Sequence, residues 1–141
     1  MSVFDSLDVL AGGLTAQRTR MDVASSNLVN AKTTRTEQGG PYKRRDVVLE
    51  AIDQGDAFAG TLSGAMQGVQ VQNVAEDPHG PRQVYDPGHP EANADGMVSM
   101  PNISTVKEYT DAFNAATLSE MMLTLMHTGV QMNEKALQLG R

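Results

Sequence analysis

The sequence has no cysteine, no tryptophan and no long apolar run, and it has few residues of positive charge. Without cysteine, neither disulfide bonds nor thiol chemistry can contribute to its structure or function. No stretch approaches the roughly 18 apolar residues that span a bilayer, so we expect no direct membrane insertion. Residues 1–20 also lack the cationic start, apolar core and cleavage site of a Sec signal peptide. We therefore expect that the chain, if it leaves the cytoplasm, uses another route.

Acidic residues outnumber basic ones, with 17 Asp and Glu against 11 Lys and Arg, which gives a net charge of −6. A nucleic-acid-binding surface needs a basic stripe, so nucleic acid is not an expected partner. Lys43, Arg44 and Arg45 form a basic run, which we interpret as the solvated face of a strand rather than a phosphate site. The 141 residues favour one domain, or one small domain with extensions, and the nine Met suggest adaptable packing surfaces.

Apolar residues near both ends of the chain recur at alternating spacings of four and three. This is the pattern of a heptad seam on a long helix. The N-terminal seam runs through Val3, Leu7, Leu10, Leu14, Gln17, Met21, Ala24, Leu28 and Ala31. The C-terminal seam runs through Ala115, Leu118, Met122, Leu125, Gly129, Met132, Ala136 and Leu139. We predict that the large apolar members of both seams form an interface, either between the two helices or with partner chains.

The N-terminal helix is predicted to begin near Ser2 or Ser6 and to stop at Lys32, where polar and β-branched residues take over. Gly12 and Gly13 fall in its middle, where each costs about 1 kcal/mol relative to Ala. Burial of the seam offsets only part of the entropy lost when so long a segment is ordered. We therefore expect this segment to be frayed alone and ordered by its neighbours.

The last helix is predicted to start after Ser104, a good N-cap, and to run for about 35 residues, a length of about 50 Å. The apolar residues in the first turns of this helix are out of phase with the later seam. These residues are Val106, Tyr109, Phe113 and Ala116. We therefore expect the apolar face to rotate midway along the helix and to contact different neighbours along its length.

Between the helices, alternating apolar and polar residues predict strands at 47–52, 68–75 and 82–85. Residues 53–67 show neither period and are expected to form a mobile loop, while prolines and glycines make 86–102 an extended connection. The fold class expected is α+β, with long N- and C-terminal helices paired as a coiled coil and a small inserted β unit. The expected domains are a terminal helical one, 1–35 with 103–141, and an inserted β-rich one, 36–102.

Two segments resemble bacterial flagellar proteins. The first resembles the Asn-Asn-Leu-Ala-Asn-x-x-Thr signature that closes the first helix of flagellar rod and hook proteins, and it matches at Asn27, Leu28, Asn30, Ala31 and Thr33. The second resembles a segment of the proximal-rod type, FlgC, and its residues include Asp86, Pro87, His89, Pro90, Gly96, Pro101 and Asn102. The first match is typical of flagellar rod and hook proteins in general. The second is more specific and points to the FlgC type among them.

The resemblance implies a structural subunit of the proximal rod. In that family the two terminal helices pair as a coiled coil and pack with those of other subunits into a hollow helical tube, with the β unit outside. Family members travel unfolded through the flagellar type III export channel, without signal cleavage, and assemble in the periplasm. The implied partners are other copies of the chain, other rod proteins, and membrane-ring and export-gate components at the rod base.

A cluster of titratable residues, Asp86, His89, Glu91 and Asp95, places one imidazole and three carboxylates within a short segment. A metal or hydrolytic site would need these groups to converge, and the intervening prolines do not supply the required spacing. We therefore favour a structural connector. The sequence also has no Gly-x-Ser-x-Gly elbow and no nucleotide-binding glycine loop. We expect no cofactor, no metal site and no enzyme activity.

Two other functions stay open at the level of sequence. A soluble helical adaptor or export-associated chaperone, forming a small closed oligomer, would also use paired helices. A periplasmic hydrolase would use the cluster around His89. A stable, highly helical dimer of the isolated chain would favour the adaptor. Retained motility after replacement of His89 and Asp86 by Ala would exclude the hydrolase.

Overall fold

The computed structural model describes residues 3–53 and 67–139. This part of the chain forms α1 (Val3–Val29), β1 (Arg45–Asp53), β2 (Gln67–Glu76), β3 (Arg82–Tyr85), β4 (Met97–Met100) and α2 (Thr105–Leu139). The α+β class predicted from the sequence is confirmed. The segment 53–67, expected to be a mobile loop, lies outside the described residues except at its two ends. Neither described helix has the length and apolar character needed to cross a membrane.

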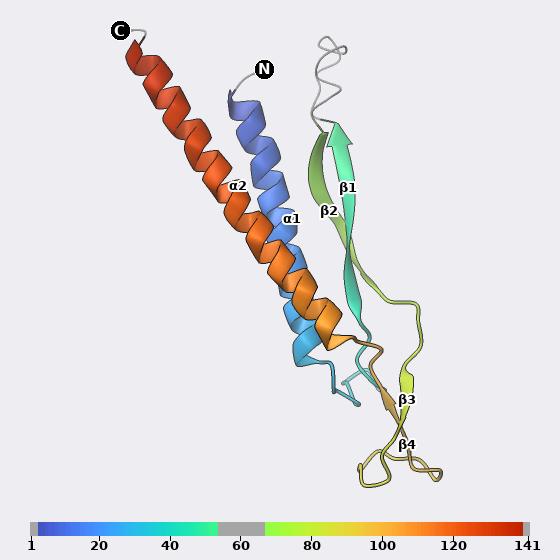
Figure 1. The fold of residues 1–141 in the computed structure, drawn as a ribbon. Helices are drawn as coiled ribbons and strands as arrows, with labels where there is room; N and C mark the ends of the chain where they lie inside the picture. Colours follow the sequence, from blue (N-terminus) through green and yellow to red (C-terminus); the bar gives the residue numbers. More distant parts are fainter. Residues whose placement is uncertain (1–2, 54–66, 140–141) are drawn as a thin grey trace.

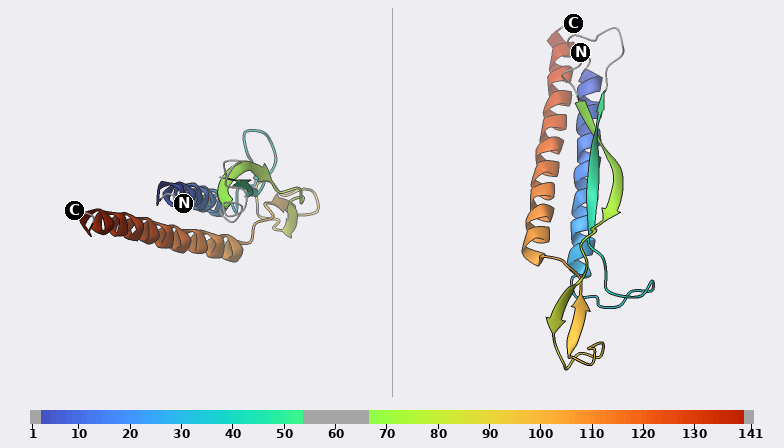
Figure 2. Two further views of the ribbon diagram at one scale, coloured as in Figure 1. Left: turned by 90° about the horizontal axis from the view of Figure 1, so that it is seen from above. Right: turned by 90° about the vertical axis from the view of Figure 1, so that its right-hand side faces the viewer.

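Helix α1 lies between α2 on one side and the β1–β2 hairpin on the other (Figure 1). The two helices pack together, and the start of α1 and the end of α2 lie at the same end of the molecule (Figure 2). The β3–β4 hairpin extends beyond the opposite end of the helices (Figure 1). The molecule is therefore elongated, with α1 as its central element.

The strands form two separate antiparallel pairs, β1 with β2 and β3 with β4. In the longer pair, Arg45 lies opposite Glu76, and the ladder continues along α1 to the other end of both strands. The first three strands match the sequence prediction. The expectation of an extended connection over 86–102 is wrong for β4, because the loop at 86–96 turns the chain back so that β4 pairs with β3.

Small residues allow α1 to pack closely against both neighbours. Gly12 faces β2, where an added Cβ would lie 2.9 Å from the Val69 carbonyl oxygen. Gly13 faces α2, where an added Cβ would lie 3.0 Å from Met122 Cε. The two adjacent glycines therefore admit the hairpin backbone on one side and a methionine on the other. The buried core adds four alanines, which are Ala16, Ala24, Ala31 and Ala115.

The face of α2 that packs on α1 coincides only in part with the predicted seam. Ala115 is fully buried, Met122 contacts Gly13, and a Cβ at Gly129 would lie 4.0 Å from Leu7 Cδ2. The half-buried positions between and beyond these residues are Thr117, Ser119, Met126 and Asn133. Four other members of the predicted seam are 39% to 89% exposed, namely Leu118, Leu125, Met132 and Leu139. The contact with α1 thus leaves a row of large apolar residues uncovered.

Candidate assembly interface

A buried polar junction joins the end of α1, the start of β1 and the first turn of α2. Its centre is Asn27, which is fully buried. The Nδ2 of Asn27 donates to Glu108 Oε2 at 2.8 Å and to the Arg45 carbonyl oxygen at 2.8 Å. Its Oδ1 accepts hydrogen bonds from the Arg45 amide at 3.0 Å and from the Tyr42 hydroxyl at 3.2 Å. Every donor and acceptor position of the side-chain amide is used, so its orientation is fixed.

Glu108 is the second buried member of the junction, and its side chain is only 2% exposed. Its Oε1 accepts a 2.6 Å hydrogen bond from Arg44 Nε, and Arg44 Nη1 also donates to Asp46 Oδ2 at 3.0 Å. Burial lowers the pKa of Arg44, but hydrogen bonds and charges from Glu108 and Asp46 outweigh it, so the pKa lies above its ordinary value. The guanidinium therefore stays charged and satisfies a carboxylate that would be costly to bury alone.

The interpretation of the basic run as one solvated face is wrong for Arg44. Its side chain is 11% exposed and pairs with Glu108, whereas Lys43 pairs with Glu76 at the surface at 3.2 Å. The guanidinium of Arg45 lies 5.8 Å from the centre of the Tyr42 ring. Sequence reasoning missed the Arg44–Glu108 pair because 64 positions separate its members and no local pattern marks it.

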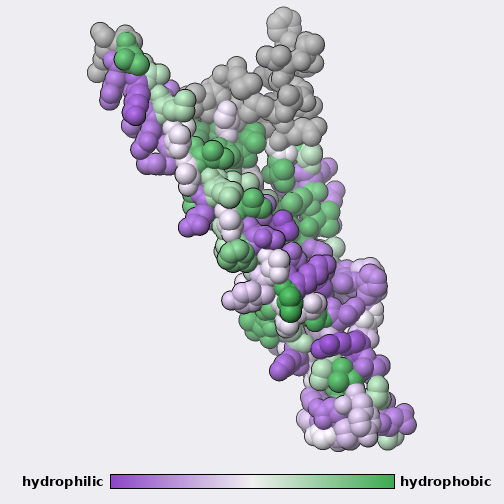
Figure 3. Space-filling model, in the orientation of Figure 1, coloured by the Kyte–Doolittle hydropathy of each residue, from purple (hydrophilic) through white to green (hydrophobic). Residues whose placement is uncertain are grey.

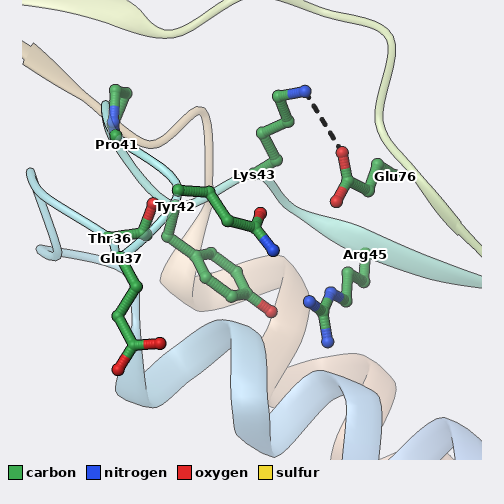
Figure 4. A pocket seen from close by; sticks show the side chains of 9 residues that line it. Thr36, Glu37, Pro41, Tyr42, Lys43, Arg45 and Glu76 are labelled. Carbon is green, nitrogen blue, oxygen red and sulfur yellow. Dashed lines mark ion pairs between the residues drawn. The ribbon is translucent and has the colours of Figure 1, made fainter.

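An open pocket of about 360 Å³ lies beside the junction, between the connector that follows α1 and the start of β1 (Figure 4). Tyr42, Lys43, Arg45 and Glu76 contribute to its lining, and the dashed line in Figure 4 marks the Lys43–Glu76 ion pair. Its two cations already interact with Glu76 and with the Tyr42 ring. The pocket therefore does not present a set of converging groups toward a ligand.

The residues of the helix-closing signature form a turn that leads into the junction. Asn30 Nδ2 donates to the Ser26 carbonyl oxygen at 2.9 Å, and the Thr33 hydroxyl donates to Asn30 Oδ1 at 3.2 Å. The Tyr42 amide donates to the Thr33 carbonyl oxygen at 3.0 Å. The connector is thereby folded back beside α1 and brings Tyr42 to Asn27. Of the other two signature residues, Leu28 is half-buried and Ala31 is buried.

The connection between β2 and β3 is also anchored to the junction. The Asp77 amide donates to the Arg44 carbonyl oxygen at 2.7 Å. Asp77 Oδ1 accepts from the His79 amide at 2.8 Å and lies 2.5 Å from the His79 ring Nδ1. The backbone hydrogen bond and then the ring contact lower the pKa of Asp77 below its ordinary value of 3.8. The Asp77 carboxylate therefore stabilises the turn at residues 77–79 and is not available to bind a ligand.

Most of the second matching segment lies in the loop between β3 and β4, and its last two residues, Pro101 and Asn102, follow β4. The Asp86 amide donates to the Gly96 carbonyl oxygen at 2.9 Å, and Asn93 Oδ1 accepts from the Met97 amide at 2.9 Å. Gly96 has a φ of +75°, and a Cβ there would lie 2.9 Å from the Tyr85 ring. Glycine is therefore needed at this position. Of the remaining matching residues, Pro101 is buried and His89 is half-buried. The exposed ones are Pro87, Pro90 and Asn102.

The titratable groups of this loop stabilise local turns and do not converge. His89 Nδ1 accepts a hydrogen bond from the Glu91 amide at 3.1 Å, and Asp86 Oδ1 accepts one from the Gly88 amide at 3.2 Å. Within the ranges 3–53 and 67–139, no three side chains of His, Cys, Asp or Glu could together hold a metal ion.

Large apolar side chains on α2 form the candidate interface. Near the start of the helix, Val106, Tyr109 and Phe113 are 77%, 71% and 67% exposed. Figure 3 shows apolar side chains at the surface along α2 and where α1 ends beside it. Contiguous exposed apolar surface of this kind marks sites of association. The predicted seam residues of α1 are by contrast half-buried, namely Leu7, Leu10, Leu14, Met21 and Leu28, while the side chain of Val3 lies outside the described part.

The chain is similar to known flagellar rod proteins. The family described as "Flagella basal body rod protein" matches residues 7–35. The chain is 40% identical to the flagellar basal-body rod protein FlgC of Bacillus subtilis, over the full length of both chains. It is 33% identical to FlgC of Borreliella burgdorferi, over 99% of this chain and 98% of that one, and 34% identical to FlgC of Salmonella typhimurium over all of both. The chain therefore belongs to the FlgC family of flagellar basal-body rod proteins, which are structural proteins and not enzymes.

Proposed function

We propose that the chain is a structural subunit of the proximal rod, and that its terminal helices pack with those of neighbouring subunits into a hollow helical tube. The tube links the membrane ring and export gate to the distal rod and transmits torque. Its neighbours are other copies of the chain and other rod proteins. Assembly takes place in the periplasm, after export without a cleaved signal peptide.

The observation that carries this proposal is the uncovered apolar surface of α2. Val106, Tyr109 and Phe113 remain largely exposed in the single chain, although a helix packs beside them. Full burial of one such side chain contributes about 1.5–3 kcal/mol. Lateral association that covers several of them is therefore favoured, and a helix face of this length suits a side-by-side array of helices.

The buried junction supports the transmission of torque. Asn27, Glu108 and Arg44 connect α1, α2 and the start of β1 through buried hydrogen bonds. Rotation of the hairpin relative to the helices would break several of these bonds at once, and each would leave a buried polar group without a partner. A subunit of this construction resists shear between its elements.

The substitution Leu14→Asp tests the proposal. Leu14 is half-buried on α1, so a carboxylate there is placed in the packed face of the helix. We expect the variant to be absent from purified basal bodies and its cells not to swim in soft agar, while circular dichroism of the isolated variant retains the strand signal. Thr15→Asp, at the neighbouring exposed position, is the control and should incorporate. Normal incorporation of the Leu14→Asp protein would contradict the proposal.

Sedimentation of the isolated chain distinguishes the rod subunit from a closed adaptor. The rod subunit should be monomeric in dilute solution, because its apolar α2 surface is completed only in a larger array. A stable and highly helical small oligomer, absent from basal bodies, would favour the adaptor or chaperone.

A further inference from the structure

Two groups of exposed apolar residues on α2 form separate patches, and other exposed apolar residues of this helix, which are Leu123, Val130 and Leu137, lie on a further face outside both. The first patch lies at the start of α2 and consists of Val106, Tyr109 and Phe113 together with Leu28 at the end of α1. A shallow groove of about 370 Å³ runs through it, and its lining includes Leu28, Val106 and Tyr109. The second patch lies farther along the helix and consists of Leu118, Met121, Leu125 and Met132, which are 39% to 67% exposed.

The two patches lie on different faces of the same helix. Each residue of an α-helix is rotated by about 100° from the one before it, so the centres of the patches are about 120° apart around the axis. The face that packs on α1, marked by Ala115 and Met122, lies on neither patch. A neighbour that covers the first patch therefore leaves the second free for another neighbour.

The patches are also separated along the helix. The centre of the first is near Tyr109, and the centre of the second is near Leu125, 16 residues later in the chain. At 1.5 Å per residue this separation is about 24 Å. Two copies that stand side by side at the same level would place each patch against polar positions of the other, such as Glu120 or Asn114, both exposed.

We infer, resting on the proposed function, that the first patch of one copy receives the second patch of the next, with the two α2 helices parallel and offset by about 24 Å. One class of contact then covers both patches of every copy. Because the two surfaces in contact differ, the association is heterologous and does not close into a two-fold dimer. Repetition of the same offset generates an ascending array of copies.

The charges on α2 agree with this offset. Glu120 follows the first patch and Lys135 follows the second, and both are exposed. They are 15 residues apart, so the proposed offset brings Glu120 of one copy level with Lys135 of the next. Opposite charges in this relation favour the offset, and they disfavour other registers in which like charges meet.

Cysteine cross-linking tests the offset, because the chain has no cysteine of its own. The double variant Tyr109→Cys with Leu125→Cys carries one thiol in each patch, too far apart for a disulfide within one chain. Mild oxidation of cells that swim with this variant should give a ladder of dimers, trimers and longer products in their basal bodies. The two single variants should give none, because equivalent positions do not meet in a heterologous contact.

The double variant Phe113→Cys with Leu118→Cys is the matched control. It also places one thiol in each patch, but at nearly the same level of the helix, so it should not form the ladder. A ladder from this control, or a dimer from either single variant, would overturn the offset. Incorporation of the Tyr109 and Leu125 double variant without a ladder would overturn it too, while leaving the proposed rod function intact. Absence of the unmodified chain from basal bodies would instead overturn the rod function.

A charge exchange gives a second test that does not depend on the incorporation of the cysteine variants. Glu120→Lys and Lys135→Glu should each reduce the swimming radius, because each places like charges at the proposed contact. The variant that carries both substitutions should recover most of the unmodified radius. A double variant that swims no better than the single variants would overturn the offset.

Discussion

Asn27 holds three segments together because its side chain both donates and accepts. Asp has nearly the same shape but no donor, so it would lose the bonds to Glu108 and to the Arg45 carbonyl oxygen and would bring two carboxylates together. The sequence signature includes Asn27 and Asn30 without distinguishing their roles. The structure shows that the first amide is fully buried at a junction and that the second closes a local turn.

We expect Asn27→Ala to destabilise the chain by about 3 kcal/mol, because it leaves Glu108 and two backbone groups of Arg45 without a buried partner. Asn30→Ala is the matched control, and its expected cost is about 1 kcal/mol because its bonds are local and only part-buried. Urea unfolding followed by circular dichroism measures both. Equal losses in the two variants would contradict the special role of Asn27.

The adjacent glycines of α1 offer a second comparison. Alanine is favoured over glycine in a helix by about 1 kcal/mol, so each substitution begins with a gain. In Gly12→Ala the new methyl meets the Val69 carbonyl oxygen, which belongs to the backbone and cannot move alone, so we expect a net loss of about 1–2 kcal/mol. In Gly13→Ala it meets the end of the flexible Met122 side chain, so we expect little net change. Thermal unfolding compares them, and a more stable Gly12→Ala protein would be the opposite result.

At the scale of elements, the helices were the most predictable part of the fold. Heptad spacing placed α1 and α2 within a few residues of their ends. It could not show which row of α2 faces α1. Close approach between the helices requires small residues, so Ala115 and Gly129 are selected for that contact together with Met122. The row of larger residues that includes Leu118 and Leu125 stays outside the contact with α1. A spacing of three and four fits this row as well as the row that packs on α1, so the pattern does not distinguish them.

Strand β4 was not predictable from local pattern, because its four residues follow a segment rich in proline and glycine. Its formation depends on the hydrogen bonds of the loop before it, in which the Asp86 amide reaches the Gly96 carbonyl oxygen and Asn93 holds Met97. Such a loop has to be closed before a strand of this length gains a partner. The sequence indicates the turn residues but not the closure.

The loop can be tested with two glycines that differ in backbone conformation. Gly96→Ala combines an unfavourable positive φ with a close approach to the Tyr85 ring, so we expect it to destabilise the β3–β4 hairpin by about 1–3 kcal/mol. Gly88→Ala meets only an ordinary contact of 3.6 Å to Asp86 Oδ1 and should be tolerated. Chemical shifts of the Tyr85 ring report the hairpin. An unchanged spectrum for Gly96→Ala would show that the conformation is not required.

At the scale of the whole molecule, the interactions that set the arrangement of elements are the ones that the sequence could not reveal. Asn27 and Glu108 are 81 positions apart, and Arg44 and Glu108 are 64 positions apart. Asn27 and Glu108 lie in helices that were correctly predicted, whereas Arg44 lies in a basic run that was interpreted as a solvated face. Their meeting depends on how α1, β1 and α2 are placed in space, and that information lies in the packed structure.

We expect the isolated chain to be less ordered at its N-terminus than the assembled one. The packing of α1 relies on small residues that bury little apolar area, so residues 2–30 should exchange their amide protons rapidly in dilute solution. Hydrogen exchange measured by mass spectrometry on the isolated chain and on purified basal bodies makes the comparison. Equally slow exchange in both would show that the chain is self-sufficient.

The pair Gly12 and Gly13 has a mechanical consequence. The Val69 carbonyl oxygen of β2 lies close to one side of α1, and the Met122 thioether of α2 lies close to another. These two close approaches restrict rotation of α1 about its own axis. If α1 turned about its own axis by one position, Ala11 would move toward the space beside the Val69 carbonyl oxygen, which admits a glycine but not a Cβ. The close packing at Gly12 therefore disfavours rotation of α1 about its axis relative to β2. On the proposed function, this restriction would help a twist applied to the helices to reach the hairpin.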